Sequence, residues 1–347
     1  MISEIIRADL HGIISDTNIP WEEFKNRTLL VTGATGLIGG ALVRALSEAN
    51  EQHGLKLRII ACGRNKEKNM STSVEYDTEF IFGDIRNSES FLNISGNIDY
   101  IFHCAAITKS ADMVSTPVDL MTTSVYGTHN MLELARVKSC RSFVYLSSME
   151  VYGQGLDGDT DETKIGCIDL SNPRSSYPES KRFCEMLCIS YVTQYNLPVK
   201  TVRLAQTFGA GTSKDDMRVF AQFARSAMNA ENIILHTEGM SRGNYCYISD
   251  SVRGLLTVLL KGKNGEAYNI ANPAASATIR EMAELVAKEI GGKQTEVVVD
   301  IPENIKKLGY ATAAEFTLNV DKLMALGWQP QFGLGEMYRR LIDDWSK

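Results

Sequence analysis

Apolar and polar positions along the chain follow a pattern in which predicted strands and helices take turns. Short runs of apolar and β-branched residues predict buried strands at residues 29–32, 57–64, 79–84, 99–106, 142–148 and 199–205. Helical periodicity separates them, most clearly at residues 127–137 and 177–195. Strands that alternate with helices form a parallel sheet covered on both faces. We therefore expect an α/β fold with a Rossmann-type doubly wound parallel sheet.

The pattern changes on either side of this segment. Near the N-terminus, the apolar spacing of residues 5–14 predicts a short amphipathic helix, which Trp21 would dock on the body. Beyond residue 205, helices and short strands mix, which is typical of a smaller α/β lobe closing over the ligand-binding end of the sheet. We expect an N-terminal extension at residues 1–26 and a Rossmann domain at 27–205, to which 244–272 return. Residues 206–243 and 273–347 would form the C-terminal substrate lobe.

Composition excludes several classes of protein. The 347 residues are 44% hydrophobic and 22% charged, as in an ordinary globular protein, and the formal net charge of −6 argues against nucleic acid as a partner. No apolar run approaches the length of a membrane span and no signal-peptide pattern opens the chain, so we expect a cytoplasmic protein with no membrane partner. Seven scattered cysteines suit reduced thiols, and five dispersed histidines predict no metal site.

A glycine-rich stretch, T-L-L-V-T-G-A-T-G-L-I-G-G at residues 28–40, joins the first predicted strand to a helix. Gly33 would permit the tight turn, Gly36 would let the backbone approach a pyrophosphate, and Gly39 would let the helix pack against the sheet. The helix N-terminus adds partial positive charge for the phosphates. The stretch therefore predicts a dinucleotide-binding loop.

The ends of the next strands indicate how the cofactor would be held. Arg64 follows Cys62 and Gly63 where an acidic residue would select NAD. Its guanidinium suits a 2′-phosphate and favours NADP, whereas stacking on adenine or pointing into solvent is the alternative, so the cofactor is NAD or NADP. Asp84 could accept the adenine amino group or cap a helix. The small residues of H-C-A-A, 103–106, would let backbone lie against a ligand.

A second stretch, S-S-Y-P-E-S-K at residues 175–181, predicts the catalytic groups. Ser176 and Glu179 have the spacing of a capping box, so a helix would start at Tyr177. Tyr177 and Lys181 then lie at i and i+4 on one face. The ammonium would lower the pKa of the phenol from about 10 toward the working pH, as a general base needs.

Together these motifs resemble the extended short-chain dehydrogenases, the NAD-dependent epimerase/dehydratase family that modifies nucleotide sugars. The similarity runs from residue 28 nearly to the C-terminus through S-S-M-E-V-Y-G, R-L-A-Q-T-F-G, Y-I-S-D-S-V-R-G-L, A-Y-N-I-A-N and L-G-W-Q-P. The resemblance implies that Tyr177 deprotonates the C4 hydroxyl of a nucleoside-diphosphate sugar while NAD(P) takes the hydride. It also implies that Lys181 binds the nicotinamide ribose and that Ser148 hydrogen-bonds the sugar oxygen.

The same resemblance implies larger binding sets and an assembly. Cofactor contacts would come from Gly33, Thr35, Gly36, Leu37, Ile38, Gly39, Arg64, Asp84, Ile85, Ala105, Ala106, Tyr177 and Lys181. Substrate contacts would come from Thr108, Ser148, Met149, Gln206 and Arg242. Many members of the family dimerise through two helices of each chain, here those near residues 117–137 and 177–195, which implies a homodimer.

Glu150 bears on which reaction follows oxidation at C4. Ser148 and Glu150 alternate along the predicted strand end, so both would face one cavity. A glutamate here is similar to that of 4,6-dehydratases and UDP-glucuronate decarboxylases, and it could remove the C5 proton that a C4 ketone acidifies. The alternative is that Glu150 forms only a structural hydrogen bond or ion pair. We expect a dehydratase or decarboxylase.

Other functions remain open on the sequence. A nucleotide-sugar 4-epimerase is one alternative, and a one-way NADP-dependent reductase of a keto-sugar or carbonyl, favoured by Arg64, is another. A non-catalytic member of the fold is disfavoured because the catalytic serine, tyrosine and lysine are all present.

Four positions depart from the family's pattern. Met149 stands where hexose dehydratases of the TDP-glucose type carry an aspartic acid that protonates the leaving hydroxyl. Gln206 and Ser124 each replace a usual asparagine. Arg242 lies one residue before the place of a diphosphate-binding arginine, where this chain has Gly243; it would either reach the diphosphate or be a solvated loop cation.

Overall fold

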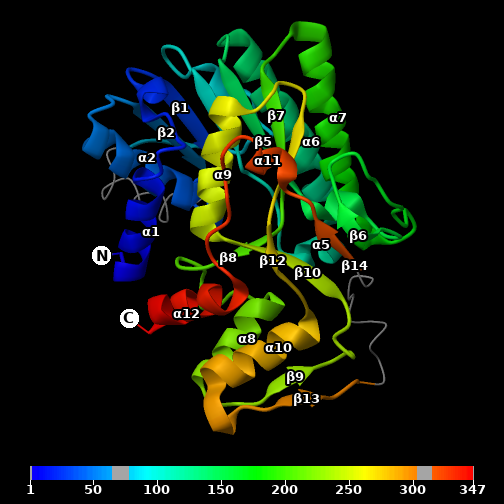
Figure 1. Cartoon of the computed structure of the whole chain (residues 1–347). Helices are drawn as coiled ribbons and strands as arrows, with labels where there is room; N and C mark the ends of the chain where they lie inside the picture. Colours follow the sequence, from blue (N-terminus) through cyan, green and yellow to red (C-terminus); the bar gives the residue numbers. More distant parts are fainter. Residues whose placement is uncertain (1, 65–77, 303–314, 347) are drawn as a thin grey trace.

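A seven-stranded parallel sheet forms the centre of the computed structural model, which describes residues 2–64, 78–302 and 315–346 (Figure 1). Its strand order is β11-β7-β5-β4-β1-β2-β3, and every neighbouring pair is parallel. The strands are β1 (Thr28–Thr32), β2 (Arg58–Gly63), β3 (Glu79–Phe82), β4 (Tyr100–His103), β5 (Ser142–Ser148), β7 (Val199–Leu204) and β11 (Ala267–Ile270). The chain builds outward from β1 to β3, then crosses back to β4 and builds the other way. This order confirms the predicted doubly wound α/β fold.

Helices cover both faces of the sheet (Figure 1). One face carries α2 (Leu37–His53) and α9 (Ile248–Lys261), and the other carries α6 (Pro117–Val137) and α7 (Ser176–Tyr195). Successive strand residues point to opposite faces, so Leu29 and Val31 join the core on the side of α2 and α9, whereas Leu30 joins the core under α6 and α7. The sheet is thus buried on both sides, as its continuous apolar strands require.

The N-terminal segment forms the predicted helix and docks as predicted. Helix α1 (Glu4–Ile14) begins after Ser3, whose side chain accepts a hydrogen bond from the backbone N–H of Ile6. Trp21, in the short turn η1 (Trp21–Phe24), is buried and donates its indole N–H to the carbonyl of Ile14 over 3.0 Å. Helix α1 packs against α2, α9 and the C-terminal helix α12 (Leu334–Trp345), so the two ends of the chain meet.

The rest of the described chain forms a mixed three-stranded sheet, two parallel two-stranded sheets and short helices (Figure 1). Strand β10 (Arg242–Tyr247) pairs with β8 (Gln206–Phe208) and β12 (Asn272–Thr278); β9 (Ile233–Leu235) pairs with β13 (Val297–Val299); and β6 (Asp157–Thr160) pairs with β14 (Glu315–Leu318). The remaining elements are α4 (Glu89–Leu92), α5 (Ser110–Ser115), η2 (Met149–Tyr152), η3 (Pro173–Ser175), α8 (Val219–Met228), α10 (Ile279–Val286), η4 (Ala287–Gly291), η5 (Gly292–Gln294) and α11 (Asp321–Met324).

Within residues 2–64, 78–302 and 315–346, no helix is both long and apolar enough to cross a membrane. In the same ranges, no group of three or more His, Cys, Asp or Glu side chains is placed to hold a metal ion. The seven cysteines, all within this part of the chain, are free thiols.

His103, the last residue of β4, is a buried histidine held between two threonines. Its Nδ1 shares a hydrogen bond with Oγ1 of Thr32 over 2.8 Å, and its Nε2 shares one with Oγ1 of Thr128 over 3.2 Å. Burial, together with the charge of Lys181, lowers the pKa of this imidazole to about 3. The folded protein therefore holds His103 neutral.

This histidine should make the protein less stable in mild acid. In the unfolded chain a histidine takes up a proton near pH 6.5, whereas the folded chain resists it down to about pH 3, so stability falls as the pH drops below 6.5. Between pH 7 and pH 5 this group alone should cost about 2 kcal/mol. His103→Gln should remove that part of the pH dependence, measured by urea unfolding at both pH values. The control His11→Gln, on the exposed side of α1, should keep the wild-type slope; an unchanged slope in the His103 variant would refute the assignment.

Candidate active site

A cavity of about 1570 Å³ lies where the carboxyl ends of the central strands face the smaller sheets. Its walls come from the loop after β1, the ends of β2, β4 and β5, the first turn of α7, and the segments around β8 and α8. Every predicted site residue except Asp84 lines it: Gly33, Thr35, Gly36, Leu37, Ile38, Gly39, Arg64, Ile85, Ala105, Ala106, Thr108, Ser148, Met149, Glu150, Tyr177, Lys181, Gln206 and Arg242. The fold thus brings together residues from distant parts of the chain.

The glycine loop at the end of β1 packs backbone against backbone. Gly33 has a φ of +67°, and a Cβ on it would lie 2.8 Å from the backbone nitrogen of Ala105. A Cβ on Gly39 would collide with the carbonyl oxygen of Gly33. At Gly36, by contrast, a Cβ would meet only the Gly33 carbonyl oxygen, at 3.3 Å, and nothing else within 4 Å. Gly36 is therefore the glycine whose open side faces free space.

These residues fit a dinucleotide. Gly36 is the N-cap of α2, no side chain caps that helix end, and no acidic residue occupies its first turn. The N–H groups at the start of α2, which line the cavity, are therefore free of an internal anion and suited to a pyrophosphate. Ala105 and Ala106, at the end of β4, leave room beside them. The glycine loop, Ala105 and Ala106 would hold the cofactor.

The two residues predicted at the adenosine end are placed differently. Arg64 follows β2, is exposed and lines the cavity. Asp84 does not line it; its carboxylate accepts hydrogen bonds from the backbone N–H and the guanidinium of Arg86. Those hydrogen bonds lower the pKa of Asp84. The helix cap predicted for Asp84 is absent, because Ser88 is the N-cap of the following helix α4; the adenine contact stays a prediction.

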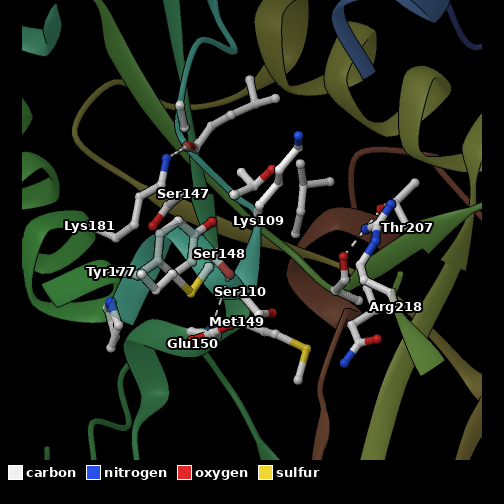
Figure 2. Close-up of a pocket in the computed structure, with 18 of the residues that line it drawn as sticks. Lys109, Ser110, Ser147, Ser148, Met149, Glu150, Tyr177, Lys181, Thr207 and Arg218 are labelled. Atoms are coloured by element: carbon white, nitrogen blue, oxygen red, sulfur yellow. Dashed lines mark hydrogen bonds between the residues drawn. The ribbon is translucent and has the colours of Figure 1, made fainter. Parts of the chain in front are cut away.

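Tyr177 is buried and lies next to Ser148, with Lys181 one turn along α7 (Figure 2). Burial raises the pKa of the phenol well above its usual value, and the charge of Glu150 raises it further. Hydrogen bonding with Ser148 and the charges of Arg174 and Arg218 act in the opposite direction. The balance favours the neutral phenol in this structure.

The predicted lowering of the Tyr177 pKa by Lys181 is wrong for this structure. The Lys181 ammonium is buried, donates a hydrogen bond to the carbonyl of Leu146 over 2.6 Å, and lies 5.9 Å from the centre of the Tyr177 ring. Burial also lowers the pKa of the lysine itself. The helix does place Tyr177 and Lys181 in one cavity, but desolvation outweighs the ammonium.

The predicted capping box at the start of α7 is also wrong. Ser176 is already helical, and its hydroxyl donates to the carbonyl of Met113 over 3.2 Å. Glu179 instead pairs with Arg182. The turn η3 leads directly into α7, so the serine side chain is used to bind α5 rather than to cap its own helix.

Glu150 lines the cavity from a short helical turn, and not from the end of a strand as predicted. Strand β5 ends at Ser148, and Glu150 lies in η2, where its backbone N–H donates to the Ser148 hydroxyl over 3.2 Å. Its carboxylate forms a bidentate ion pair with Arg174: Nη1 lies 2.8 Å from Oε2 and Nη2 lies 2.9 Å from Oε1. The ion pair that the sequence left as an alternative is therefore present.

Several cavity residues were missed at the level of sequence. Arg174, Lys109, Arg218 and His236 all line the cavity. Arg218 precedes α8 and is paired with Asp216 over 2.6 Å. Arg174 stands three residues before Tyr177, a position that could have marked it, whereas no local pattern distinguishes the other three.

The predicted substrate residues lie along the far wall. Gln206 opens β8, and Arg242 opens β10, where it donates to the carbonyl of Ser276 over 3.3 Å and lies 3.4 Å from the Glu281 carboxylate. Thr108 follows β4 and is exposed. Met149, the first residue of η2, brings an apolar side chain to the wall next to Glu150 (Figure 2).

Comparison with known proteins gives consistent matches over most of the chain. A sequence model of the NAD dependent epimerase/dehydratase family matches residues 29–271. The dTDP-D-glucose 4,6-dehydratase of Bos taurus is 28% identical over 333 residues, covering 93% of this chain and 90% of that protein. UDP-glucuronic acid decarboxylase 6 of Arabidopsis thaliana is 30% identical over 318 residues, covering 90% of this chain and 86% of that one.

Solved structures share the fold. The dTDP-glucose 4,6-dehydratase of Streptomyces venezuelae, determined with NAD bound, superposes with a TM-score of 0.76 at 23% identity. The match covers 92% of this chain and 97% of that one. At this identity, the likeness establishes the α/β architecture.

Substitution by alanine should have different effects at two glycines of the loop, Gly39 and Gly36. Gly39→Ala should cost about 1–3 kcal/mol of stability, because its methyl group must displace the backbone of Gly33. Gly36→Ala should keep stability within about 1 kcal/mol but weaken NAD binding on the order of tenfold, because its methyl group enters the space of the pyrophosphate. Thermal unfolding and titration calorimetry with NAD measure both effects.

A matched control comes from the same helix. Gly40→Ala would place a methyl group 3.3 Å from the Ala34 carbonyl oxygen, a contact as close as that at Gly36, but outside the cavity lining. Its NAD affinity should equal that of the wild type. If Gly36→Ala bound NAD equally tightly, the pyrophosphate would not lie at this loop.

Proposed function

The chain belongs to the NAD-dependent epimerase/dehydratase family, and from that premise we propose that it oxidises the C4 hydroxyl of a nucleoside-diphosphate sugar and then removes a group at C5–C6. The product would arise by loss of water, as in a 4,6-dehydratase, or of carbon dioxide, as in a uronate decarboxylase. The observation that carries the proposal is the grouping of Ser148, Glu150 and Tyr177 in one cavity beside the glycine loop.

The named relatives support this choice of reactions. One acts, by its name, as a dTDP-D-glucose 4,6-dehydratase and the other as a UDP-glucuronic acid decarboxylase, and each match covers nine-tenths or more of this chain. Both names specify a nucleoside diphosphate joined to glucose or to its uronic acid, glucuronic acid. We therefore take such a sugar nucleotide as the substrate.

Tyr177 would accept the proton of the C4 hydroxyl. NAD, which the glycine loop with Ala105 and Ala106 would hold, would supply the hydride acceptor for this oxidation. The phenolate oxygen of Tyr177 takes the proton of the C4 hydroxyl, and the Ser148 hydroxyl donates a hydrogen bond to the same sugar oxygen. Ser148, Arg174 and Arg218 all favour the ionised form of Tyr177, against the burial that opposes it.

Glu150 would handle the proton at C5. A ketone at C4 makes the C5–H bond acidic, and the Glu150 carboxylate accepts that proton as a leaving group departs from C6. In the decarboxylase outcome the C5–H bond is kept: the bond between C5 and the carboxylate carbon breaks, carbon dioxide leaves, and the resulting enolate would receive a solvent proton at C5 by way of Glu150. Met149 has no proton to give a departing hydroxide, which supports loss of neutral carbon dioxide.

We further propose that the protein is a homodimer assembled on α6 and α7. These helices pack side by side on one face of the sheet (Figure 1). Large apolar side chains on both are exposed: Val118, Met121, Tyr126, Val137, Phe183, Met186, Ile189 and Tyr195. A second copy related by a twofold axis would cover this face with the same face of its own.

The catalytic assignments predict separate effects for two variants. Tyr177→Phe should reduce turnover by about 100-fold or more, because it removes the proton acceptor at C4. Glu150→Gln should still oxidise C4 but lose the incorporation of solvent deuterium at C5. Assays with dTDP-glucose and with UDP-glucuronic acid in D₂O, read by mass spectrometry, measure both effects and show which group is lost.

The matched control is Glu179→Gln, on α7, whose carboxylate pairs with Arg182 outside the cavity lining. It should leave turnover and deuterium incorporation unchanged. Turnover of the Tyr177 variant within a few-fold of wild type would contradict the proposal, as would deuterium at C5 in the product of the Glu150 variant. A 4-epimer as the sole product would replace the elimination step with epimerisation.

The dimer proposal predicts that charge on the exposed face separates the subunits. The double variant Phe183→Asp, Met186→Asp should elute as a monomer, whereas the wild type should have twice the chain mass by light scattering. Leu170→Asp, at an exposed apolar residue outside α6 and α7, should remain dimeric. A monomeric wild type would rule out this assembly.

A further inference from the structure

Arg174 lines the cavity, but the proposed function gives this residue no role of its own. Resting on that function, we propose that Arg174 is a positioning residue that lets Glu150 and Tyr177 carry negative charge in the same cavity, by holding the Glu150 carboxylate in a bidentate ion pair. Arg174 would not touch the reacting atoms. It would act through Glu150 and, by its charge, on Tyr177.

The geometry of the pair is specific. The two terminal guanidinium nitrogens of Arg174 donate to the two carboxylate oxygens of Glu150, over 2.8 and 2.9 Å. The Arg174 side chain is 17% exposed and that of Glu150 is 33% exposed, so solvent screens the pair only in part. The turn that carries the arginine is itself fixed, because its backbone N–H donates to the Asn172 side chain over 3.0 Å. A bidentate, half-buried pair on a fixed turn holds Glu150 in one orientation.

The proposed reaction brings two like charges together. Tyr177 must become a phenolate and Glu150 must be a carboxylate, and both line one cavity (Figure 2). Beyond the effect of burial, the charge of Glu150 raises the pKa of Tyr177, and the charge of Arg174 lowers it. Without the arginine, ionising Tyr177 would place a second anion near an unpaired first one.

The other charged groups near Tyr177 that the structure describes do not pair with Glu150. Arg218, before α8, already pairs with Asp216, and Lys181, on α7 itself, donates to the Leu146 carbonyl. From β5, Ser148 contributes a hydroxyl without charge. From α5 and α6, the contacts are apolar, through Met113 and Leu120. Among the residues that the structure describes, Arg174 is the cation paired with Glu150.

The test is the pH dependence of C4 oxidation, followed in single turnovers by the absorbance of reduced nicotinamide. The rate of C4 oxidation should rise with pH, and this rising limb of the pH profile should move up by about one pH unit in Arg174→Met. At a fixed pH on the limb, the variant should therefore be about tenfold slower than the wild type. Adding Glu150→Gln to Arg174→Met should bring the limb back to that of the wild type, because both charges of the pair are then gone. Arg174→Lys keeps the charge without the bidentate pair and should shift the limb less.

The control is Arg182→Met on α7, the helix that carries Tyr177. Arg182 also pairs with a glutamate and donates to the Val151 carbonyl in η2, so its loss disturbs the same turn without changing the charge that acts on Tyr177. Its pH limb should stay in place. A rate in Arg174→Met that falls equally at every pH, with no recovery in the double variant, would show a merely structural role and overturn the inference.

A second readout needs no substrate. At one alkaline pH, the tyrosinate absorbance due to Tyr177 is the part that is lost on Tyr177→Phe. This part should be smaller in the Arg174→Met background and should recover when Glu150→Gln is added to Arg174→Met. An unchanged signal would overturn the inference, whatever the substrate proves to be. A separate result would contradict the proposed function itself: full turnover of Tyr177→Phe with Arg174 unchanged.

Discussion

The close approach of two backbone segments at the carboxyl ends of β1 and β4 is the constraint on which the rest of the site depends. Gly33 leaves β1 with a positive φ and lies against Ala105 with no space for a side chain, and Gly39 packs on Gly33 in turn. This contact brings the N-terminus of α2 to the edge of the sheet. The cavity therefore opens between β1 and β4, where the doubly wound order reverses direction and ligands bind.

Burial and charge act against each other inside this cavity. The phenol of Tyr177 is desolvated, which favours its neutral form, while a hydroxyl and two guanidinium groups favour its ionised form. The nearby carboxylate of Glu150 adds to the cost of ionisation, and the charge of Arg174, its bidentate partner, acts in the opposite direction. The site thus depends on a balance among groups from β5, η2, η3 and α7 rather than on one tyrosine–lysine pair.

The segments beyond β7 close the cavity and join it to the ends of the chain. Arg218, His236 and Arg242 reach the cavity from three different segments. The C-terminal helix that packs beneath them is tied to α1, because Asp9 binds Arg340 over 2.8 Å and Tyr247 over 2.7 Å. The same helix holds the loop before α8, where the Asp344 carboxylate accepts the backbone N–H of Gly211. Packing at the two termini therefore supports the wall that carries Arg218.

The sequence by itself determined the parallel sheet, the dinucleotide loop and the Tyr177–Lys181 face, because each depends on spacing along a single element: alternating apolar runs, glycines three apart, and one turn of helix. Only the tertiary structure decided the features that depend on residues distant in sequence. Arg174 pairs with Glu150 across 24 positions, and Ser176 binds the Met113 carbonyl across 63 instead of capping its own helix. The ionisation state of Tyr177 was also decided by the tertiary structure, because desolvation and the charges of partners arise only when distant segments pack around a side chain.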